Sequence, residues 1–429
     1  MYNLVDCFEK YGRIMQFNKN KQEPIHRWYP FVEGYSKEFV LSIVNELQVK
    51  PQTCLEPFSG SGTTALELQK LGIKCHSFEI NPFMYLLSSV KLETSYNIDN
   101  VTTYFERIKN QRISLDFKLP ETDFYTLYES KNRKKANYSN SVGIAVQKLK
   151  LLINKIEEDK YKNLFTVALA AILLDVSHLY RNGKCLSYKS NWKDLNLSEV
   201  DVFEIFDKKV TSCILPDILT LNENQNDVSN KVYLYNEDSR IGIDQKIQDN
   251  SIDLVITSPP YLNSRDYTDT YMLELKTLGM TPTYESIISL RNKTVRSHVQ
   301  IRWTDKSKDP DGELAKTMML LNRAASESNV WNPSIQDMVN LYFVDIRKVF
   351  KNLYSKLRTN GKVYFNVSNS AYFGVLVDTL QICSSIAESE GFCIEEIRKA
   401  RMLKTSPQQK ESIGSLLEGV IVMHKKEVA

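Results

Sequence analysis

The chain has 429 residues, of which 42% are hydrophobic and 25% are charged, and its formal net charge is +3. This length predicts two or three domains, or one domain with large insertions. No run of about 18 apolar residues occurs, so we expect no membrane-spanning helix. The N-terminus MYNLVDCFEKYGR lacks the order of a secretory signal. The seven cysteines are scattered without a C-x-x-C pair, which favours a cytoplasmic location and argues against a zinc site.

The first predicted elements alternate between helix and strand. Helical spacing predicts a helix over 36–49 with Ser36 as its N-cap, followed by a short strand over 53–55. A helix over 65–71 and a strand over 73–78 follow. This alternation predicts the first half of a doubly wound, mostly parallel α/β sheet of the Rossmann-like type.

The alternation breaks in the middle of the chain. Residues 95–228 contain helical patterns at 143–157 and 161–181 without a strand–helix–strand succession, which predicts a mostly helical insertion. The flanking parts, 1–94 and 229–429, are predicted to form the sheet domain. In the second part we expect, in order, strands at 231–235 and 252–256, a basic loop at 282–335, a helix at 337–357, a strand at 361–367, a helix at about 374–389 and strands at 392–398 and 418–424.

A glycine turn follows the first strand of the predicted sheet. Gly60-x-Gly62-x-x-Ala65 lies after a strand and before a helix, where glycines let the backbone approach a nucleoside and helix N–H groups point at it. Glu79 ends the next strand, where a carboxylate can hold both ribose hydroxyls. The alternative is a tight turn beside a surface acid. A Walker-type phosphate loop is excluded because no Gly-Lys-Ser/Thr follows.

Two further strand ends carry polar groups. Asp238 follows the strand at 231–235, where it can accept a hydrogen bond from an adenine amino group or, alternatively, cap a helix. Ser258-Pro259-Pro260-Tyr261 follows the strand at 252–256, and its two prolines end that strand in a rigid corner. The Ser258 hydroxyl and the Pro259 carbonyl can hold the two hydrogens of an exocyclic base amine, while Tyr261 stacks on the base. A base in a duplex would have to flip out to reach this corner.

Together these motifs resemble the S-adenosylmethionine-dependent amino-methyltransferases that act on DNA. LEPFSGSGTT resembles their cofactor loop, SFEINP their ribose-binding segment, NEDS their adenine-contacting segment and DLVITSPPY their catalytic motif, while WYPFVEGYS resembles a motif that often precedes the cofactor loop. The resemblance covers 26–82 and 232–266. It implies S-adenosyl-L-methionine as the cofactor and double-stranded DNA as the substrate.

The resemblance also implies roles for individual residues. The catalytic set is Ser258, Pro259, Pro260 and Tyr261. The cofactor-binding set comprises Tyr29, Pro30, Ser36, Glu56, Pro57, Phe58, Ser59, Gly60, Gly62, Thr63, Thr64, Glu79, Ile80, Asp238, Ser239 and Ser258. In that family a serine before the two prolines usually marks cytosine N4 as the target, although some adenine-N6 enzymes carry serine too. We therefore expect a site-specific cytosine-N4 methyltransferase, with adenine N6 as the first alternative and a companion restriction endonuclease left open as a partner.

The segment 95–228 departs from the family pattern. One helix usually separates the ribose acid from the adenine acid, whereas here the whole segment lies between Glu79 and Asp238. We interpret it as an inserted target-recognition region; the alternative is that Asp238 is misassigned. Cations and aromatic residues that are candidates for DNA contact, or else parts of solvated loops, are Arg181, Lys184, Tyr188 and Lys189 in the insertion, and Arg265, Arg291, Lys293 and Arg296 beyond the catalytic corner.

Two other functions share some of these features. An RNA amino-methyltransferase would use the same corner, but we recognise no RNA-capturing domain. A nicotinamide-dependent oxidoreductase would use the glycine turn and the acid after it, but it leaves Ser258–Tyr261 unexplained and has no evident hydride-handling His or Lys. No metal role is assigned, because the histidines are isolated: His26, His76, His178, His298 and His424.

Overall fold

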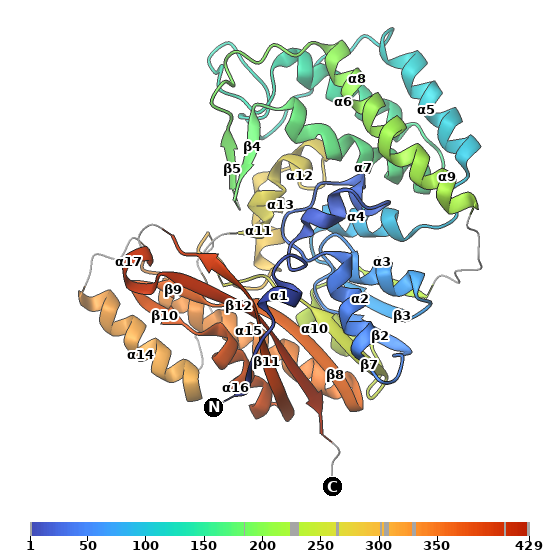
Figure 1. The fold of residues 1–429 in the computed structure, drawn as a ribbon. Coiled ribbons are helices and arrows are strands. Elements are labelled where there is room, and N and C mark those ends of the chain that lie inside the picture. The colour runs from blue at the N-terminus through green and yellow to red at the C-terminus, as the bar shows by residue number, and fades with distance from the viewer. Residues whose placement is uncertain are drawn as a thin grey trace.

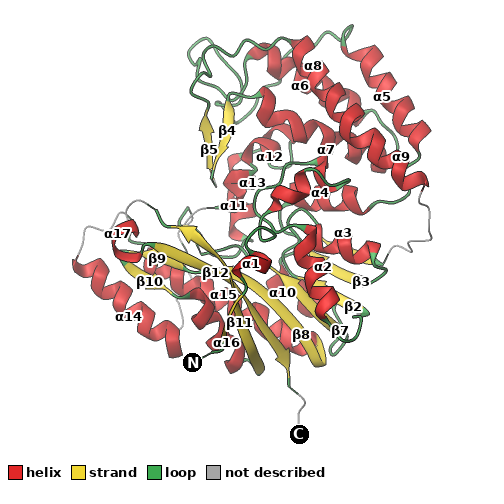
Figure 2. Ribbon diagram, viewed as in Figure 1, coloured by secondary structure: helices red, strands yellow, loops and turns green. Residues whose placement is uncertain are grey.

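The computed structural model describes residues 2–183, 185–223, 231–262, 266–300, 303, 309–327, 332–406 and 409–426. The chain forms two lobes (Figure 1), a sheet lobe below and a mostly helical lobe above, and Figure 2 shows how strands and helices divide between them. The predicted fold class is confirmed: a doubly wound, mostly parallel α/β sheet with a largely helical insertion. Within the described ranges no helix combines the length and the apolar character that a membrane span requires.

The sheet lobe is built on eight strands. They are β1 (Leu4–Asp6), β2 (Thr53–Glu56), β3 (Lys74–Phe78), β6 (Val232–Tyr235), β7 (Ile252–Thr257), β8 (Leu357–Ser368), β11 (Phe392–Lys404) and β12 (Ser415–Lys425), in the spatial order β1-β11-β12-β8-β7-β2-β3-β6. Only β12 is antiparallel to its neighbours, β8 and β11. From β2 the chain runs outward through β3 and β6 and then returns to β7 on the other side of β2. This reversal opens a crevice at the carboxyl ends of β2 and β7, where such folds bind ligands.

Helices cover both faces of the sheet. One face packs against α2 (Lys37–Glu46), α3 (Thr63–Lys70) and α4 (Pro82–Leu92), and the other against α10 (Ser239–Lys246), α15 (Ile335–Lys356) and α16 (Thr379–Ser389). Side chains of β8 alternate between the two cores: Val363 and Phe365 join the second core and Tyr364 joins the first. This alternation explains why β8 carries the consecutive apolar residues Val363, Tyr364 and Phe365, as expected for a strand buried on both faces.

The helical lobe contains five helices of the insertion and three that follow the catalytic corner. They are α5 (Ile98–Arg112), α6 (Asn140–Asn154), α7 (Asp159–Val176), α8 (Glu199–Lys209) and α9 (Leu215–Glu223), with a π-helical turn, η3 (Val210–Ile214), before α9, and then α11 (Tyr267–Thr270), α12 (Met272–Leu278) and α13 (Tyr284–Asn292). A hairpin, β4 (Leu179–Asn182) and β5 (Cys185–Tyr188), projects from this lobe (Figure 1). Because α12 packs on α7, residues beyond the corner also belong to this lobe.

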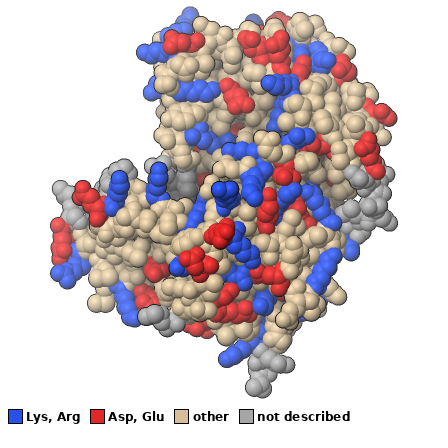
Figure 3. Space-filling view, in the orientation of Figure 1, with Lys and Arg blue, Asp and Glu red and all other residues tan. Residues whose placement is uncertain are grey.

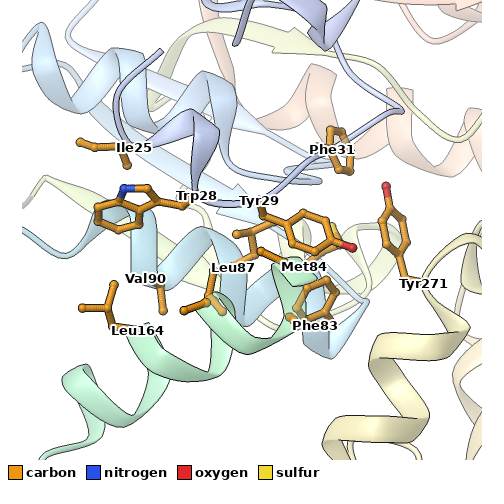
Figure 4. Packing of buried hydrophobic residues seen from close by; sticks show 14 of the residues in the cluster. Ile25, Trp28, Tyr29, Phe31, Phe83, Met84, Leu87, Val90, Leu164 and Tyr271 are labelled. Carbon is orange, nitrogen blue, oxygen red and sulfur yellow. The ribbon is translucent and has the colours of Figure 1, made fainter. Parts of the chain in front are cut away.

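The two lobes share one apolar core around residues 25–31 (Figure 4). Trp28 and Tyr29 are buried between α4 and α7. The rings of Tyr29 and Phe83 pack edge to face, with 4.9 Å between their centroids. The Phe31 ring stacks on Tyr271 in the segment between α11 and α12, with 6.0 Å between ring centroids. The N-terminal segment therefore fixes the helical lobe against the sheet.

Some predicted boundaries differ from the structure. The helix predicted over 161–181 ends at Val176, and its last residues belong to the β4–β5 hairpin. The predicted loop 282–335 contains α13 and a further helix, α14 (Gly312–Glu327). The last two strands are longer than predicted, and their tip extends beyond the sheet. A two-stranded ribbon, β9 (Ser370–Tyr372) and β10 (Val375–Val377), and the short helices α1 (Phe8–Tyr11) and α17 (Lys410–Ile413) complete the sheet lobe.

Candidate active site

A cleft of about 1190 Å³ lies at the carboxyl ends of the central strands, between the two lobes. Its wall brings together parts of all four predicted strand-end motifs. The predicted residues that line it are Pro57, Phe58, Gly60, Glu79, Ile80, Arg181, Asp238, Ser239, Ser258, Pro259, Pro260, Tyr261 and Lys293. Four stretches far apart in the chain therefore meet at one site.

The glycine turn after β2 is held from below by α4. Gly60 and Gly62 have φ angles of 53° and 77°, a left-handed conformation that favours glycine. A Cβ on Gly62 would lie 2.9 Å from Ser88 Oγ, so this position has no room for a side chain. Ser88 Oγ donates to the Gly60 carbonyl at 3.0 Å, and Lys91 Nζ donates to the Ser61 carbonyl at 3.0 Å. Burial lowers the pKa of Lys91 to about 7.

Glu79 lies directly beside this turn. Its Oε2 accepts a hydrogen bond from the Gly60 N–H at 2.7 Å and its Oε1 accepts one from the Asn81 N–H at 2.8 Å. Burial raises the pKa of Glu79 to about 7, although both N–H groups favour the carboxylate. The acid that follows β3 is thus held at the glycine turn by two backbone N–H groups.

Glu56 connects the glycine turn to the catalytic corner from inside the protein. Its Oε2 accepts from the Tyr35 hydroxyl at 2.9 Å, and its Oε1 accepts from the Phe58 N–H at 3.1 Å and from the Thr257 hydroxyl. Burial raises the pKa of Glu56 to about 7. Because Thr257 immediately precedes Ser258, this carboxylate holds the ends of β2 and β7 in a fixed relation.

Asp238 both caps α10 and lines the cleft. Its carboxylate accepts a hydrogen bond from the Arg240 N–H at 2.9 Å and forms an ion pair with the Arg240 guanidinium at 2.7 Å. Arg240 also pairs with Asp345 at 2.7 Å. The helix-cap alternative is therefore present in the structure, and the same carboxylate faces the cleft.

The corner at Ser258–Tyr261, predicted to be catalytic, is held by residues of the last strands. The Ser258 hydroxyl donates to the Tyr261 hydroxyl oxygen at 3.2 Å, and the Tyr261 hydroxyl donates to Glu418 Oε1 at 2.6 Å. Asn366 Nδ2 donates to the same Tyr261 oxygen at 2.6 Å, and Arg401 forms an ion pair with Glu418. Burial, with Glu418 close by, raises the pKa of Tyr261 well above its usual range. This arrangement fixes the Tyr261 ring at the cleft wall.

The chain is similar in sequence to several known proteins. No family model matches it. It is 26% identical over 438 residues to the Type II methyltransferase M.BsoBI of Geobacillus stearothermophilus, covering 91% of this chain and 83% of that protein. It is 25% identical over 411 residues to the Type II methyltransferase M.AvaI of Anabaena variabilis, covering 90% and 82%, and 28% identical over 264 residues to the Type II methyltransferase M.MvaI of Kocuria varians, covering 58% and 55%. The chain is a homologue of the Type II methyltransferases. The resemblance predicted from the motifs is confirmed.

Several predicted cofactor residues lie beneath the cleft wall. The Tyr29 hydroxyl donates to Glu274 at 2.5 Å, and Ser36 Oγ donates to the Ile14 carbonyl at 3.0 Å. The Pro30 carbonyl accepts from Arg181 at 3.4 Å. The predicted residues that do not line the cleft are Tyr29, Pro30, Ser36, Glu56, Ser59, Gly62, Thr63 and Thr64. Their contacts support the turn and the lobe junction.

The predicted DNA-contacting cations divide into two groups. Arg181 and Lys293 line the cleft, although Arg181 is also paired with Glu274 at 2.7 Å. Arg291 is ion-paired with Asp266 and Asp269, and Arg296 is 4% exposed and paired with Asp345 at 2.7 Å, so neither presents a free charge to the cleft. The structure therefore places Arg291 and Arg296, two of the candidates for DNA contact, in ion pairs within the protein.

The remaining predicted DNA-contacting residues lie near the hairpin. Lys189 Nζ donates to three carbonyls at the end of α7, those of Leu174, Asp175 and Ser177, which gives it a structural role. Tyr188 carries the ammonium of Lys135 over its ring, 4.7 Å from the centroid. Lys184 and Arg265 lie outside the described residues. In the part of the chain that the structure describes, no group of three or more His, Cys, Asp or Glu side chains could hold a metal ion.

The sequence did not single out Asn366, Arg401 or Glu418. Asn366 interrupts the apolar run of β8, and Glu418 is 1% exposed near the start of an apolar stretch of β12. The sequence signal for these residues is a polar side chain inside a strand that is buried on both faces, because a buried polar group needs a hydrogen-bond partner.

Proposed function

We propose that this protein is a site-specific DNA methyltransferase that transfers a methyl group from S-adenosylmethionine to the exocyclic amine of a flipped base, with cytosine N4 as the target. The supporting observation is that the glycine turn, Glu79, Asp238 and the Ser258–Tyr261 corner line one cleft in a homologue of the Type II methyltransferases. Neither the glycine turn nor the corner alone would support this function. Their convergence does.

The cleft fits a nucleoside cofactor. The backbone at Gly60 is left-handed and lies within 2.7 Å of a Glu79 oxygen, and each carboxylate oxygen keeps a lone pair for a ribose hydroxyl. Asp238 stands at the next strand end to accept from an adenine amine. When bound, S-adenosylmethionine supplies an electrophilic methyl group. The volume of about 1190 Å³ exceeds that of a typical small-molecule pocket and leaves room for a base beside the cofactor.

The corner fits the amine of a base. The lone pair of an exocyclic amine is delocalised into the ring, so the amine is a weak nucleophile until its hydrogens are held and its plane is turned toward the methyl group. Ser258 Oγ and the Pro259 carbonyl supply two acceptors on a backbone made rigid by proline. Tyr261 supplies a face on which the base can stack, an interaction worth about 1–3 kcal/mol. The main contribution of these residues is positioning.

Two hairpin tips on facing walls of the cleft define the approach of a duplex. Arg181, Gly183 and Cys185 belong to the β4–β5 hairpin, while Leu403 and Lys404 belong to the β11–β12 tip, and all line the cleft (Figure 1). We assign base reading to the β4–β5 hairpin because, among the described residues of the insertion, those that line the cleft belong to this hairpin.

Beside this hairpin lies a basic loop, 131–135, which contains Lys131, Arg133, Lys134 and Lys135. All four side chains are exposed and, among the described residues, have no ion-pair partner. Lys135 stacks on Tyr188 of β5, and the Asn137 carbonyl accepts from the His178 N–H at 2.8 Å, so the loop adjoins the hairpin. Figure 3 shows Lys and Arg side chains on this edge of the helical lobe and along the junction of the lobes. We assign this basic loop to DNA phosphates.

The proposed function can be tested directly with radiolabelled S-adenosylmethionine and a set of duplexes. Label should appear in DNA, and digestion to nucleosides followed by mass spectrometry should give N4-methylcytosine at one short sequence. N6-methyladenine would retain the enzyme class and replace the base assignment. Label in structured RNA alone, or tight binding of NAD without binding of S-adenosylhomocysteine, would overturn the proposal.

A further inference from the structure

A chain of hydrogen bonds runs from Ser258, at the end of β7, to Glu418 on β12, two strands away in the sheet. It passes from Ser258 Oγ to the Tyr261 hydroxyl at 3.2 Å and from that hydroxyl to Glu418 Oε1 at 2.6 Å. Ser258, Tyr261 and Glu418 all line the cleft, and Glu418 is 1% exposed. The serine that would meet the target amine is thus connected to a buried carboxylate on β12.

The direction of this chain follows from the number of hydrogens. A carboxylate has only acceptor oxygens, so the one hydrogen of the Tyr261 hydroxyl points at Glu418. The tyrosine oxygen can then only accept, and the Ser258 hydroxyl must donate to it. With its hydrogen committed, Ser258 Oγ presents lone pairs alone to a group in the cleft.

Two neighbours hold Glu418 in this acceptor role. Arg401 on β11 forms an ion pair with its Oε2, which holds that carboxylate oxygen in place. Asn366 on β8 donates through Nδ2 both to Glu418 Oε1 at 3.2 Å and to the Tyr261 oxygen at 2.6 Å. The opposite orientation of this amide would place its oxygen against the carboxylate, so the amide orientation is fixed as well.

We propose that Glu418, through Tyr261, makes Ser258 a hydrogen-bond acceptor toward the target amine; this inference rests on the proposed function. A serine hydroxyl is ambivalent. If it donated to the amine nitrogen it would occupy the lone pair that must attack the methyl group. If it accepts from an N–H it leaves that lone pair available and aimed at the cofactor. Glu418, Asn366 and Arg401 are therefore positioning residues that act through Tyr261.

The test compares Tyr261→Phe, Glu418→Gln and the double variant in single-turnover methylation at saturating DNA and cofactor. Tyr261→Phe keeps the stacking ring and removes only the hydroxyl, so base flipping, followed by 2-aminopurine fluorescence at the target, should be unchanged. We expect each single change to slow transfer about tenfold, the effect of one hydrogen bond to a charged group. The double variant should be no slower than either single variant, because all three variants remove the same orientation of the Ser258 hydroxyl.

A rescue separates this role from a merely structural one. In the Tyr261→Phe background, Ser258→Asp replaces a hydroxyl, which can donate or accept, by a carboxylate, which can only accept hydrogen bonds. We expect the rate of methyl transfer to recover several-fold. The matched control is Tyr342→Phe, which removes a buried hydroxyl outside the cleft with no hydrogen-bond partner among the described atoms, and should leave the rate unchanged.

Additive losses in the double variant, or no recovery with Ser258→Asp, would overturn the inference. If Glu418→Gln does not fold, Tyr261→Phe and its rescue still decide the question. A wild-type rate in Tyr261→Phe would also contradict the inference while leaving the proposed function intact. The absence of methyl transfer by the wild-type protein would instead refute the proposed function.

Discussion

Charged side chains are held differently on the two sides of the cleft. In the sheet lobe the arginines near the cleft are part-buried or buried and paired: Arg240 with Asp238 and Asp345, Arg296 with Asp345, and Arg401 with Glu418. In the helical lobe the basic loop 131–135 exposes four cations, without an ion-pair partner in the described part of the chain. Some cations elsewhere in the same lobe are paired, as Arg112 is with Asp207 at 2.5 Å.

This difference indicates separate roles: the buried ion pairs fix the geometry of the site, and the exposed cations supply affinity for DNA. Breaking a buried pair by removing one partner leaves an uncompensated charge, so such pairs hold backbone and side chains in place. Exposed cations contribute little to stability, but they can replace the counterions of DNA. We therefore expect substitutions on the sheet side to change the chemical step or cofactor affinity, and substitutions in the basic loop to change salt-dependent DNA affinity.

The largest expected effect is that of Tyr261→Ala on the sheet side. Loss of the ring and its hydroxyl should lower the single-turnover rate about 100-fold, since stacking alone is worth about 1–3 kcal/mol. The dissociation constant of S-adenosylhomocysteine, measured by calorimetry, should change less than twofold because the ring lies at the corner and not at the glycine turn. Equal losses of rate and cofactor affinity would mean that the corner only supports the fold.

The next effect would come from neutralising the basic loop. With Lys131, Arg133, Lys134 and Lys135 all changed to Ala, the plot of log affinity for DNA against log salt should become shallower by up to about 4. The transfer rate at saturating DNA should stay at the wild-type value. Fluorescence anisotropy between about 50 and 200 mM salt measures the slope.

The control for this experiment neutralises exposed cations away from the hairpin. Arg107, Lys155, Lys208 and Lys348 are exposed and, among the described residues, have no ion-pair partner. Helix α5, which carries Arg107, lies on the opposite side of the helical lobe from β4–β5 (Figure 1). Changing these four to Ala should leave the slope as it is. Equal changes in both quadruple variants would show that the basic loop is an ordinary solvated surface.

Each part of the site that could be predicted is a short, continuous stretch of sequence. The glycine turn, Glu79 and Ser258–Tyr261 each directly follow a strand with a clear apolar pattern, and parallel strands place their carboxyl ends at one edge. Local pattern therefore sufficed for the sheet fold and for the convergence of the motifs.

What could not be predicted depends on long-range pairing. Glu418 reaches Tyr261 only because β12 inserts between β11 and β8, an order that no local pattern specifies. The same limit applies to Arg291 and Arg296 as candidates for DNA contact, because sequence does not show that they would meet Asp266 and Asp345. Asn366 was passed over because it stands within an otherwise apolar strand.

A smaller effect is expected from Glu79→Gln on cofactor binding. The Gln side chain has one acceptor oxygen where the Glu carboxylate has two, so one contact with a ribose hydroxyl is weakened. We therefore expect the dissociation constant of S-adenosylhomocysteine to rise about tenfold. The rate at saturating cofactor should fall much less. An unchanged dissociation constant would remove Glu79 from the ribose role.

The smallest effect, and the one that isolates Glu79, is the dependence of cofactor affinity on pH. Burial raises the pKa of Glu79 to about 7, so in the free protein this group gains a proton as the pH falls from 8 to 6. Ribose hydroxyls donate better to the carboxylate than to the carboxylic acid, so binding favours the ionised form and affinity should decrease below pH 7, by up to about tenfold per unit. Glu79→Gln should flatten this profile. The pKa values of Glu56 and Lys91 are also shifted to about 7, but both residues lie outside the cleft wall and remain in the variant, so any slope that persists there comes from these two groups. Identical profiles in the two proteins would show that Glu79 does not meet the cofactor as a carboxylate.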